Sequence, residues 1–128
     1  MSKVVVFVDD SKTVLLTAQM IVKSLVEKGD LEFKSYENPL ELLKDVENGF
    51  SYDLLITDVN MPQMNGLDMA KELKSNPNLK SKPILALTTE NAPEKKAKAK
   101  EIGLAGWITK PFSPDKLLMG IKRVLRLR

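Results

Sequence analysis

The sequence predicts a three-layer α/β domain in which helices cover both faces of a five-stranded parallel sheet. Short apolar runs alternate with amphipathic stretches along the whole chain, which is typical of strands connected by helical crossovers. Several runs are apolar at nearly every position, as expected of strands that are buried on both faces. The length of 128 residues fits one ordinary domain, so we expect a single domain over residues 1–128.

The expected strands differ in pattern, and the difference predicts their order in the sheet. Residues 4–8, 54–56 and 84–87 are apolar runs that belong in the sheet interior. Residues 32–36 alternate polar and aromatic side chains, which indicates an edge strand, and residues 107–109 form the other edge. Right-handed crossovers then favour the flavodoxin-like strand order 2-1-3-4-5, with ligands outside the carboxyl ends of the strands.

The first two helices carry both periodic and terminal signals. Apolar residues recur at helical spacing over 14–25, and Gly29 stands where such a helix should stop. Asn38 is placed to cap the second helix, with Pro39 in its first turn and Glu41 positioned to bond back to the cap.

The remaining helices differ in how firmly we expect them to be anchored. Apolar spacing over 67–73 predicts a third helix that ends before Pro77. Residues 113–115 open the last helix, whose apolar side chains over 117–125 face inward. The stretch 94–102 has only alanines and one isoleucine as apolar residues, so this helix should be weakly anchored.

Composition excludes several classes of protein. Hydrophobic residues make up 43% and charged residues 29%, as in soluble globular proteins, and no apolar run approaches the roughly 20 residues that span a bilayer. The N-terminal apolar run is too short for a signal peptide, so we expect a cytoplasmic protein without membrane association. Cysteine and histidine are absent, which excludes thiolate zinc sites and an imidazole general base. The net charge of +3 is mild and no recognition motif occurs, so nucleic-acid binding is not expected.

Polar side chains follow four of the expected strands. They are Asp9, Asp10, Asp58, Thr88, Thr89 and Lys110. Because the carboxyl ends of parallel strands share one edge of the sheet, these groups should converge there. Clustered carboxylates repel one another, and a hard divalent cation relieves that repulsion. Mg²⁺ needs few protein ligands, so it suits this sparse set better than Ca²⁺.

Each of these residues also has an ordinary structural explanation. An aspartate after the first strand often caps the next helix, Asp58 can be a turn residue, Thr88 can be a cap, and Lys110 can be solvated. Their joint occurrence at four strand ends favours a functional site.

Four segments resemble the receiver domain of response regulators. They are Val-Asp-Asp-Ser at 8–11, Thr-Asp-Val-Asn-Met-Pro-Gln-Met-Asn-Gly at 57–66, Leu-Thr-Thr-Glu at 87–90 and Gly-Trp-Ile-Thr-Lys-Pro-Phe at 106–112. The resemblance covers essentially the whole chain, with the motifs in order. Length and the last segment are most similar to free-standing chemotaxis regulators of the CheY type.

The resemblance implies a phosphoryl-transfer site. Asp58 would be the phosphoacceptor, taking the group from a phosphohistidine on a histidine kinase. Asp10, Asp58 and the backbone carbonyl of Asn60 would hold Mg²⁺, with Asp9 acting directly or through water. Lys110 would pair with a phosphoryl oxygen.

The resemblance also implies how the phosphoryl group is bound and read. The hydroxyl of Thr88 and the backbone of Asn60 and Thr89 would contact it, and the peptide before Pro111 would be cis. Thr88 would move toward the phosphoryl group, and Trp107 would swing inward, unless Trp107 is a static packing residue of the edge strand. The family more often has Tyr or Phe there.

Further family features concern the lifetime and the output of the signal. Asn60 and Glu90 occupy positions that tune hydrolysis, and their polarity favours a short-lived signal. The helix at 94–102, the strand with Trp107 and the last helix would form the face that binds a protein target. On this face Lys95, Lys98, Lys122 and Arg126 suit an acidic partner, although they are at least equally well explained as solvated side chains. We expect a monomer.

Three other classes of protein would need features that this sequence lacks, and one variant of the receiver hypothesis stays open. A phosphohydrolase of the haloacid-dehalogenase type needs a second aspartate where this chain has Asn60, together with a cap domain. A flavodoxin-like electron carrier needs a hydroxyl- and glycine-rich loop after the first strand, and a nucleotide-binding half-domain needs a glycine motif that is missing. A receiver used for scaffolding or phosphoryl storage remains open.

Overall fold

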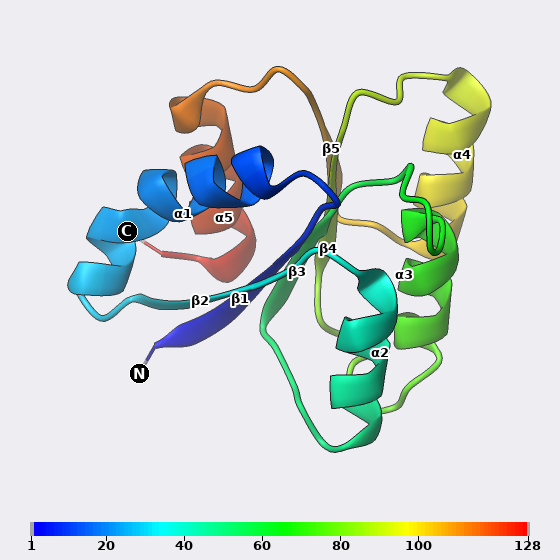
Figure 1. Ribbon diagram of the computed structural model, residues 1–128, viewed down its shortest axis with the longest axis horizontal. Helices are drawn as coiled ribbons and strands as arrows, with labels where there is room; N and C mark the ends of the chain where they lie inside the picture. Colours follow the sequence, from blue (N-terminus) through cyan, green and yellow to red (C-terminus); the bar gives the residue numbers. More distant parts are fainter. Residues whose placement is uncertain (1, 128) are drawn as a thin grey trace.

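The computed structural model describes residues 2–127 as a five-stranded parallel sheet between two layers of helices (Figure 1). The strands run in the order β2-β1-β3-β4-β5, which confirms the expected topology. The strand bounds are β1 (Lys3–Val8), β2 (Leu31–Tyr36), β3 (Leu54–Thr57), β4 (Ile84–Thr88) and β5 (Gly106–Thr109). The helix bounds are α1 (Lys12–Glu27), α2 (Pro39–Glu47), α3 (Gly66–Lys74), α4 (Pro93–Ile102) and α5 (Pro114–Leu125).

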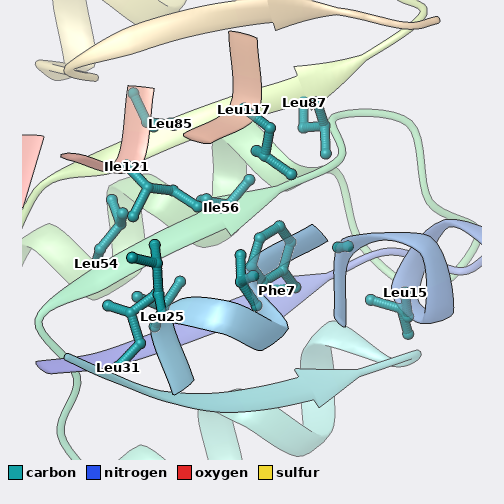
Figure 2. Close-up of a cluster of buried hydrophobic side chains, with 13 residues drawn as sticks. Phe7, Leu15, Leu25, Leu31, Leu54, Ile56, Leu85, Leu87, Leu117 and Ile121 are labelled. Carbon is teal, nitrogen blue, oxygen red and sulfur yellow. The ribbon is translucent and has the colours of Figure 1, made fainter. Parts of the chain in front are cut away.

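Helices α1 and α5 cover one face of the sheet, while α2, α3 and α4 cover the other (Figure 1). The strands contribute alternate side chains to the two sides, as the period of two requires. On β1, for example, Phe7 packs on the α1–α5 side and Val6 on the opposite side. Figure 2 shows the first of these cores, in which side chains of α1, such as Leu25, and of α5, such as Ile121, meet the sheet.

Burial follows the expected difference between central and edge strands. All of β3 and β4 is buried. On β2 the polar residues are exposed and Phe33 is only half-buried, and no residue of β5 is fully buried. The two edges of the sheet are therefore partly wet, as their sequences predict.

Four helices begin with a side-chain cap. Ser11, Asn38, Asn65 and Ser113 each accept a hydrogen bond from a backbone N–H in the first turn of the following helix. At α2 the expectation was only partly right, because Glu41 makes no side-chain bond back to Asn38 within residues 2–127.

None of the helices in the described part of the chain has the length and apolar character of a membrane span.

Candidate functional site

The sheet itself brings the predicted site residues together. The hydrogen-bond ladder continues past the strand ends: Asp58 N–H donates to Val8 O at 2.9 Å, and Lys110 N–H donates to Thr88 O at 2.9 Å. The Asp9 N–H is fixed in the same way by Tyr36 O at 3.1 Å. Main-chain register therefore places the acids and the lysine at one edge, which we call the carboxyl rim.

Three carboxylates meet at the carboxyl rim. Each of Asp9, Asp10 and Asp58 offers an oxygen, and these three oxygens lie within 4.8 Å of one another. Asp9 and Asp58 are buried, at 3% and 8% exposure, while Asp10 faces solvent. Two desolvated acids beside a third, solvent-facing one form a cluster of negative charge.

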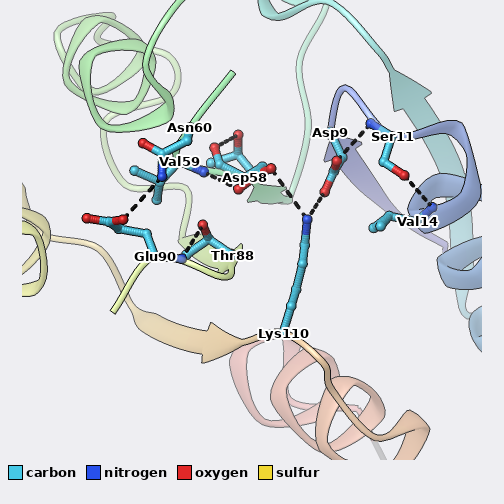
Figure 3. A network of polar contacts seen from close by, with 10 residues as sticks. Asp9, Ser11, Val14, Asp58, Val59, Asn60, Thr88, Glu90 and Lys110 are labelled. Atoms are coloured by element: carbon cyan, nitrogen blue, oxygen red, sulfur yellow. Dashed lines mark hydrogen bonds and ion pairs between the residues drawn. The ribbon is translucent and has the colours of Figure 1, made fainter. Parts of the chain in front are cut away.

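Lys110 is the cation that faces this charge (Figure 3). Its Nζ donates to Asp9 Oδ2 at 2.6 Å and to Asp58 Oδ2 at 3.4 Å, and its side chain is only 13% exposed. The shorter distance makes Asp9 the main partner of Lys110. The peptide from Lys110 to Pro111 is cis, as the resemblance implied.

Burial raises the pKa of Asp9 above its ordinary value. The Lys110 ammonium, which bonds to Oδ2, and the Ser11 N–H, which bonds to Oδ1 at 2.9 Å, oppose the rise, while the charge of Asp58 adds to it. Three carboxylates against one ammonium leave an excess of negative charge. A divalent cation of hard, oxygen-seeking character would balance it.

Asp58 is held in one orientation by the chain around it. Its Oδ1 accepts the Val59 N–H at 2.7 Å, and its main-chain carbonyl accepts the Thr57 hydroxyl at 2.9 Å. Behind it lies Gly66, where an added Cβ would overlap the Asp58 carbonyl oxygen and lie 3.0 Å from Val59 Cα. The close approach of α3 thus requires a glycine.

Gly66 is a site residue that was not predicted from the sequence. The signal in the sequence was the Asn-Gly pair directly after the aspartate loop. Glycine disfavours a helix, so a glycine in the first turn indicates a position where a side chain would not fit.

A second network joins the loop after β4 to the edge strand. Thr88 is fully buried, and its Oγ1 accepts the Glu90 N–H at 3.1 Å. The Glu90 carboxylate accepts the Asn60 side-chain amide at 3.2 Å, and the Glu90 carbonyl accepts Trp107 Nε1–H at 3.1 Å. Glu90 thereby links the loop after Asp58, the end of β4 and the indole of β5.

Thr89 is exposed and stands apart from both networks. It lines a mainly apolar hollow of about 410 Å³ beside Lys110, which also involves Thr13, Val14, Thr17, Pro111 and Phe112. The structure thus places Asp9, Asp10, Asp58 and Lys110 in one cluster, and it joins Asn60, Thr88 and Trp107 through Glu90. Thr89 belongs to neither group.

Comparison with known proteins identifies the family of this chain. Residues 5–122 match the family model of the response regulator receiver domain. The chain is 34% identical over 118 residues to chemotaxis protein CheY1 of Helicobacter pylori, covering 92% of this chain and 93% of that protein.

Two solved structures resemble this chain over nearly its whole length. CheY4 of Vibrio cholerae superposes with a TM-score of 0.82 at 37% identity, covering 97% of this chain and 99% of that one. The receiver domain of the sensor histidine kinase PA1611 of Pseudomonas aeruginosa, solved with a magnesium ion in its active-site cleft, covers 98% of this chain and 99% of that one with a TM-score of 0.83. At 18% identity that second likeness shows the fold alone. The chain belongs to the response regulator receiver family, with chemotaxis regulators of the CheY type among its relatives.

Proposed function

We propose that this chain is a phosphoacceptor switch of a two-component system, which takes a phosphoryl group on Asp58 from a histidine kinase and passes the signal to a protein target. The observation that supports the proposal most is the contact of one partly buried ammonium, Lys110, with two buried carboxylates of the acid cluster. Because it accepts a phosphoryl group rather than turning over a separate substrate, we class it as a signalling protein and not an enzyme.

The chemistry we assign to Asp58 is an in-line displacement at phosphorus. One oxygen of its carboxylate attacks, an acyl phosphate bond forms, and the bond from phosphorus to the donor imidazole nitrogen breaks. The Val59 N–H holds the carboxylate in orientation during the attack. Lys110 already lies 3.4 Å from Asp58 Oδ2, so a modest shift away from Asp9 lets its ammonium pair with a phosphoryl oxygen.

The acid cluster fits Mg²⁺. We assign Asp10, Asp58 and the backbone carbonyl of Asn60 as its ligands, with Asp9 acting directly or through water. The exposed carboxylate of Asp10 makes no hydrogen bond to any of residues 2–127, so it is free to act as a ligand. When bound, the cation supplies positive charge that offsets the repulsion between the carboxylates and an incoming phosphoryl group.

The switch we propose runs through Glu90. The Thr88 hydroxyl now accepts from the Glu90 N–H, and turning this hydroxyl toward a phosphoryl oxygen weakens that bond. The Glu90 carbonyl, which holds the Trp107 indole, moves with the loop, so the indole is released to turn inward. Phosphorylation would thereby be read at the α4–β5–α5 surface, which we propose as the face for the target.

The same network bears on the lifetime of the signal. The Asn60 amide and the Glu90 carboxylate bond to each other beside Asp58 (Figure 3), and we propose that these polar groups flank the path of an attacking water. We therefore propose a short-lived acyl phosphate, with Asn60→Ala and Glu90→Ala changing its half-life. A phosphoprotein that persists for hours in the presence of Mg²⁺ would contradict this part of the proposal.

Fluorescence offers a direct test because Trp107 is the single tryptophan of the chain. The protein would be titrated with Mg²⁺ and then with beryllofluoride, a stable mimic of the phosphoryl group. We expect saturable changes at both steps in wild type, loss of the beryllofluoride step in Asp58→Asn and weaker Mg²⁺ binding in Asp10→Asn. If wild type shows no fluorescence change and calorimetric titration detects no binding of either ligand, the proposed switch is refuted. Calorimetric binding without a fluorescence change would retain the site and remove Trp107 from the mechanism.

A further inference from the structure

A groove runs between α3 and α4, which lie side by side in Figure 1. Its volume is about 450 Å³, and its lining residues are Lys71, Lys74, Ser75, Lys98, Glu101 and Ile102. Most of these residues belong to the second halves of the two helices. Helices in this fold begin near the carboxyl rim and end at the opposite side of the sheet, so the groove is separate from the phosphoacceptor site.

The groove has an excess of positive charge. Three lysines line it against one glutamate. Lys98 pairs with Asp68 at 3.6 Å, but both side chains are more than half exposed, so this ion pair contributes little stabilising free energy. Within residues 2–127, neither Lys71 nor Lys74 has a carboxylate within ion-pair distance.

Lys74 extends across the groove toward the end of α4. A Cβ placed on Gly103, just past that helix, would lie 3.9 Å from Lys74 Cε. Within the described part of the chain, the Lys74 ammonium donates only to the Lys80 carbonyl at 3.5 Å, the weak end of hydrogen-bond geometry. Two helices thus direct cations without strong partners into one hollow.

The floor of the groove and the helix beside it are incompletely covered. Ile102 is half-buried and packs under the lysines against the core. On α4 only Ala99 is buried, and the helix carries four lysines and two glutamates, so it is polar on nearly every side. A helix of this kind gains stability when a partner contacts it.

We propose that the α3–α4 groove is a second protein-docking surface, which binds an acidic segment whose one apolar side chain rests on Ile102. Charge complementarity argues for the acidic segment, because three lysines meet it with one opposing carboxylate. Asp68 and Glu101 interrupt the basic surface, and neither arginine nor an aromatic lines the groove, so a continuous phosphate backbone fits it poorly. This surface does not depend on phosphorylation of Asp58.

The position of the groove separates it from the output face. The basic residues that the sequence suggested for an acidic partner divide between two layers, because Lys98 faces α3 while Lys122 and Arg126 belong to or follow α5 on the other side of the sheet. One partner at the α3–α4 groove and another at the α4–β5–α5 face would therefore share α4 and contact its two flanks, the first on the side of α3 and the second on the side of β5.

The test is a titration of the isotope-labelled full chain, in which the NMR chemical shifts of its backbone amides report binding. The probe is a synthetic peptide of glutamates around a central leucine. We expect the shifts to concentrate in the second halves of α3 and α4 and to weaken with salt. The variant Lys71→Glu with Lys98→Glu should weaken binding by about tenfold, from exposed pairs of modest energy. A matched control, Lys23→Glu with Lys44→Glu, reverses two exposed lysines on α1 and α2, outside both proposed docking faces, and should leave binding unchanged.

Three results would overturn the proposal. The first is an absence of shifts at low salt, and the second is equal weakening by the control variant, which would indicate net charge alone. The third is tighter binding of single-stranded oligothymidylate at the same amides, which would assign the groove to nucleic acid. Well-dispersed amide spectra of both variants establish that they are folded.

Discussion

At the scale of single residues, the interior contains one polar group whose environment does not satisfy it. Tyr52 is 2% exposed, and among residues 2–127 its hydroxyl is the buried side-chain atom without a hydrogen-bond partner. Tyr36, by contrast, donates its hydroxyl to Asp45 Oδ2 at 2.6 Å. The two tyrosines therefore provide a matched pair, one hydroxyl with a partner and one without.

Replacing Tyr52 by Phe should leave the free energy of unfolding unchanged or raise it by about 1 kcal/mol, because an unsatisfied buried hydroxyl is removed. Replacing Tyr36 by Phe should lower it by about 1 kcal/mol, because Asp45 loses a donor. Urea denaturation at neutral pH measures both. A loss in Tyr52→Phe as large as that in Tyr36→Phe would contradict the assignment.

The same tyrosines should make stability depend on alkaline pH. Burial raises the pKa of Tyr52 above its ordinary value of 10.0, and burial together with the bond to Asp45 raises the pKa of Tyr36. The folded protein therefore keeps these protons at pH values where the unfolded chain has released them. Stability from this source is full below about pH 10 and falls as the pH rises beyond it.

Urea midpoints measured across this range should fall more steeply in wild type than in the double variant Tyr36→Phe with Tyr52→Phe. The comparison of slopes isolates the tyrosines, because all other ionisable groups are the same in both proteins. Parallel slopes would contradict the prediction.

Gly66 is the residue whose size the site constrains most closely. Gly66→Ala forces a Cβ onto the Asp58 carbonyl, so we expect a loss of about 1–3 kcal/mol in unfolding free energy and slower phosphorylation. Gly120→Ala in α5 is the control, because its Cβ meets only the ends of flexible side chains, Ile108 Cδ1 at 3.4 Å being the nearest. Equal stability of the two variants would show that α3 can withdraw from Asp58 at no cost.

At the scale of elements, α4 is the least anchored helix. Its single buried residue is Ala99, whereas α3, of similar length, buries Gly66, Leu67, Met69, Ala70 and Leu73. Its N-cap is Ala92, which cannot accept a first-turn N–H through its side chain. Hydrogen exchange should therefore be faster in the amides of α4 than in those of α3.

Ala92→Ser supplies the missing cap. The extended backbone at this position (φ −65°, ψ 133°) suits a capping serine, so we expect the local stability of α4 to rise by about 1 kcal/mol and its amide exchange to slow. Ala97→Ser, at an exposed position within the same helix, is the control and should not slow exchange. Protection of α4 equal to that of α3 in wild type would contradict the description of α4.

Sequence reasoning was sufficient for the elements whose signals are local. The apolar runs identified the central strands, and the caps at Asn38 and Ser113 lie at helix starts. The cap of α1 is Ser11 and not one of the preceding aspartates, which the sequence offered as an alternative explanation of those acids. The sparse apolar content of 94–102 predicted the weak burial of α4. The reciprocal hydrogen bond between the Glu41 side chain and the backbone of Asn38 was predicted and is absent from the part of the chain that the structure describes. A capping pattern shows that such a bond is feasible and not that it forms.

At the scale of the whole molecule, the sequence predicted the carboxyl rim because parallel strands place their ends together. It could not predict how the charges divide within the rim. That Lys110 lies nearer Asp9 than Asp58, and that Glu90 joins Thr88, Asn60 and Trp107, depends on side-chain packing from four segments. The need for glycine at position 66 likewise follows from the approach of α3 to β3.

The measurement that tests the central claim most directly is the mass of the intact protein after incubation with Mg²⁺ and acetyl phosphate, followed by mapping of the modified residue. We predict a gain of one phosphoryl group, located on Asp58, that requires Mg²⁺ and disappears in Asp58→Asn. Lys110→Ala and Asp10→Asn should reduce the labelled fraction without moving the site. The absence of label in a folded wild-type protein that binds Mg²⁺, or label on any residue other than Asp58, would contradict the account.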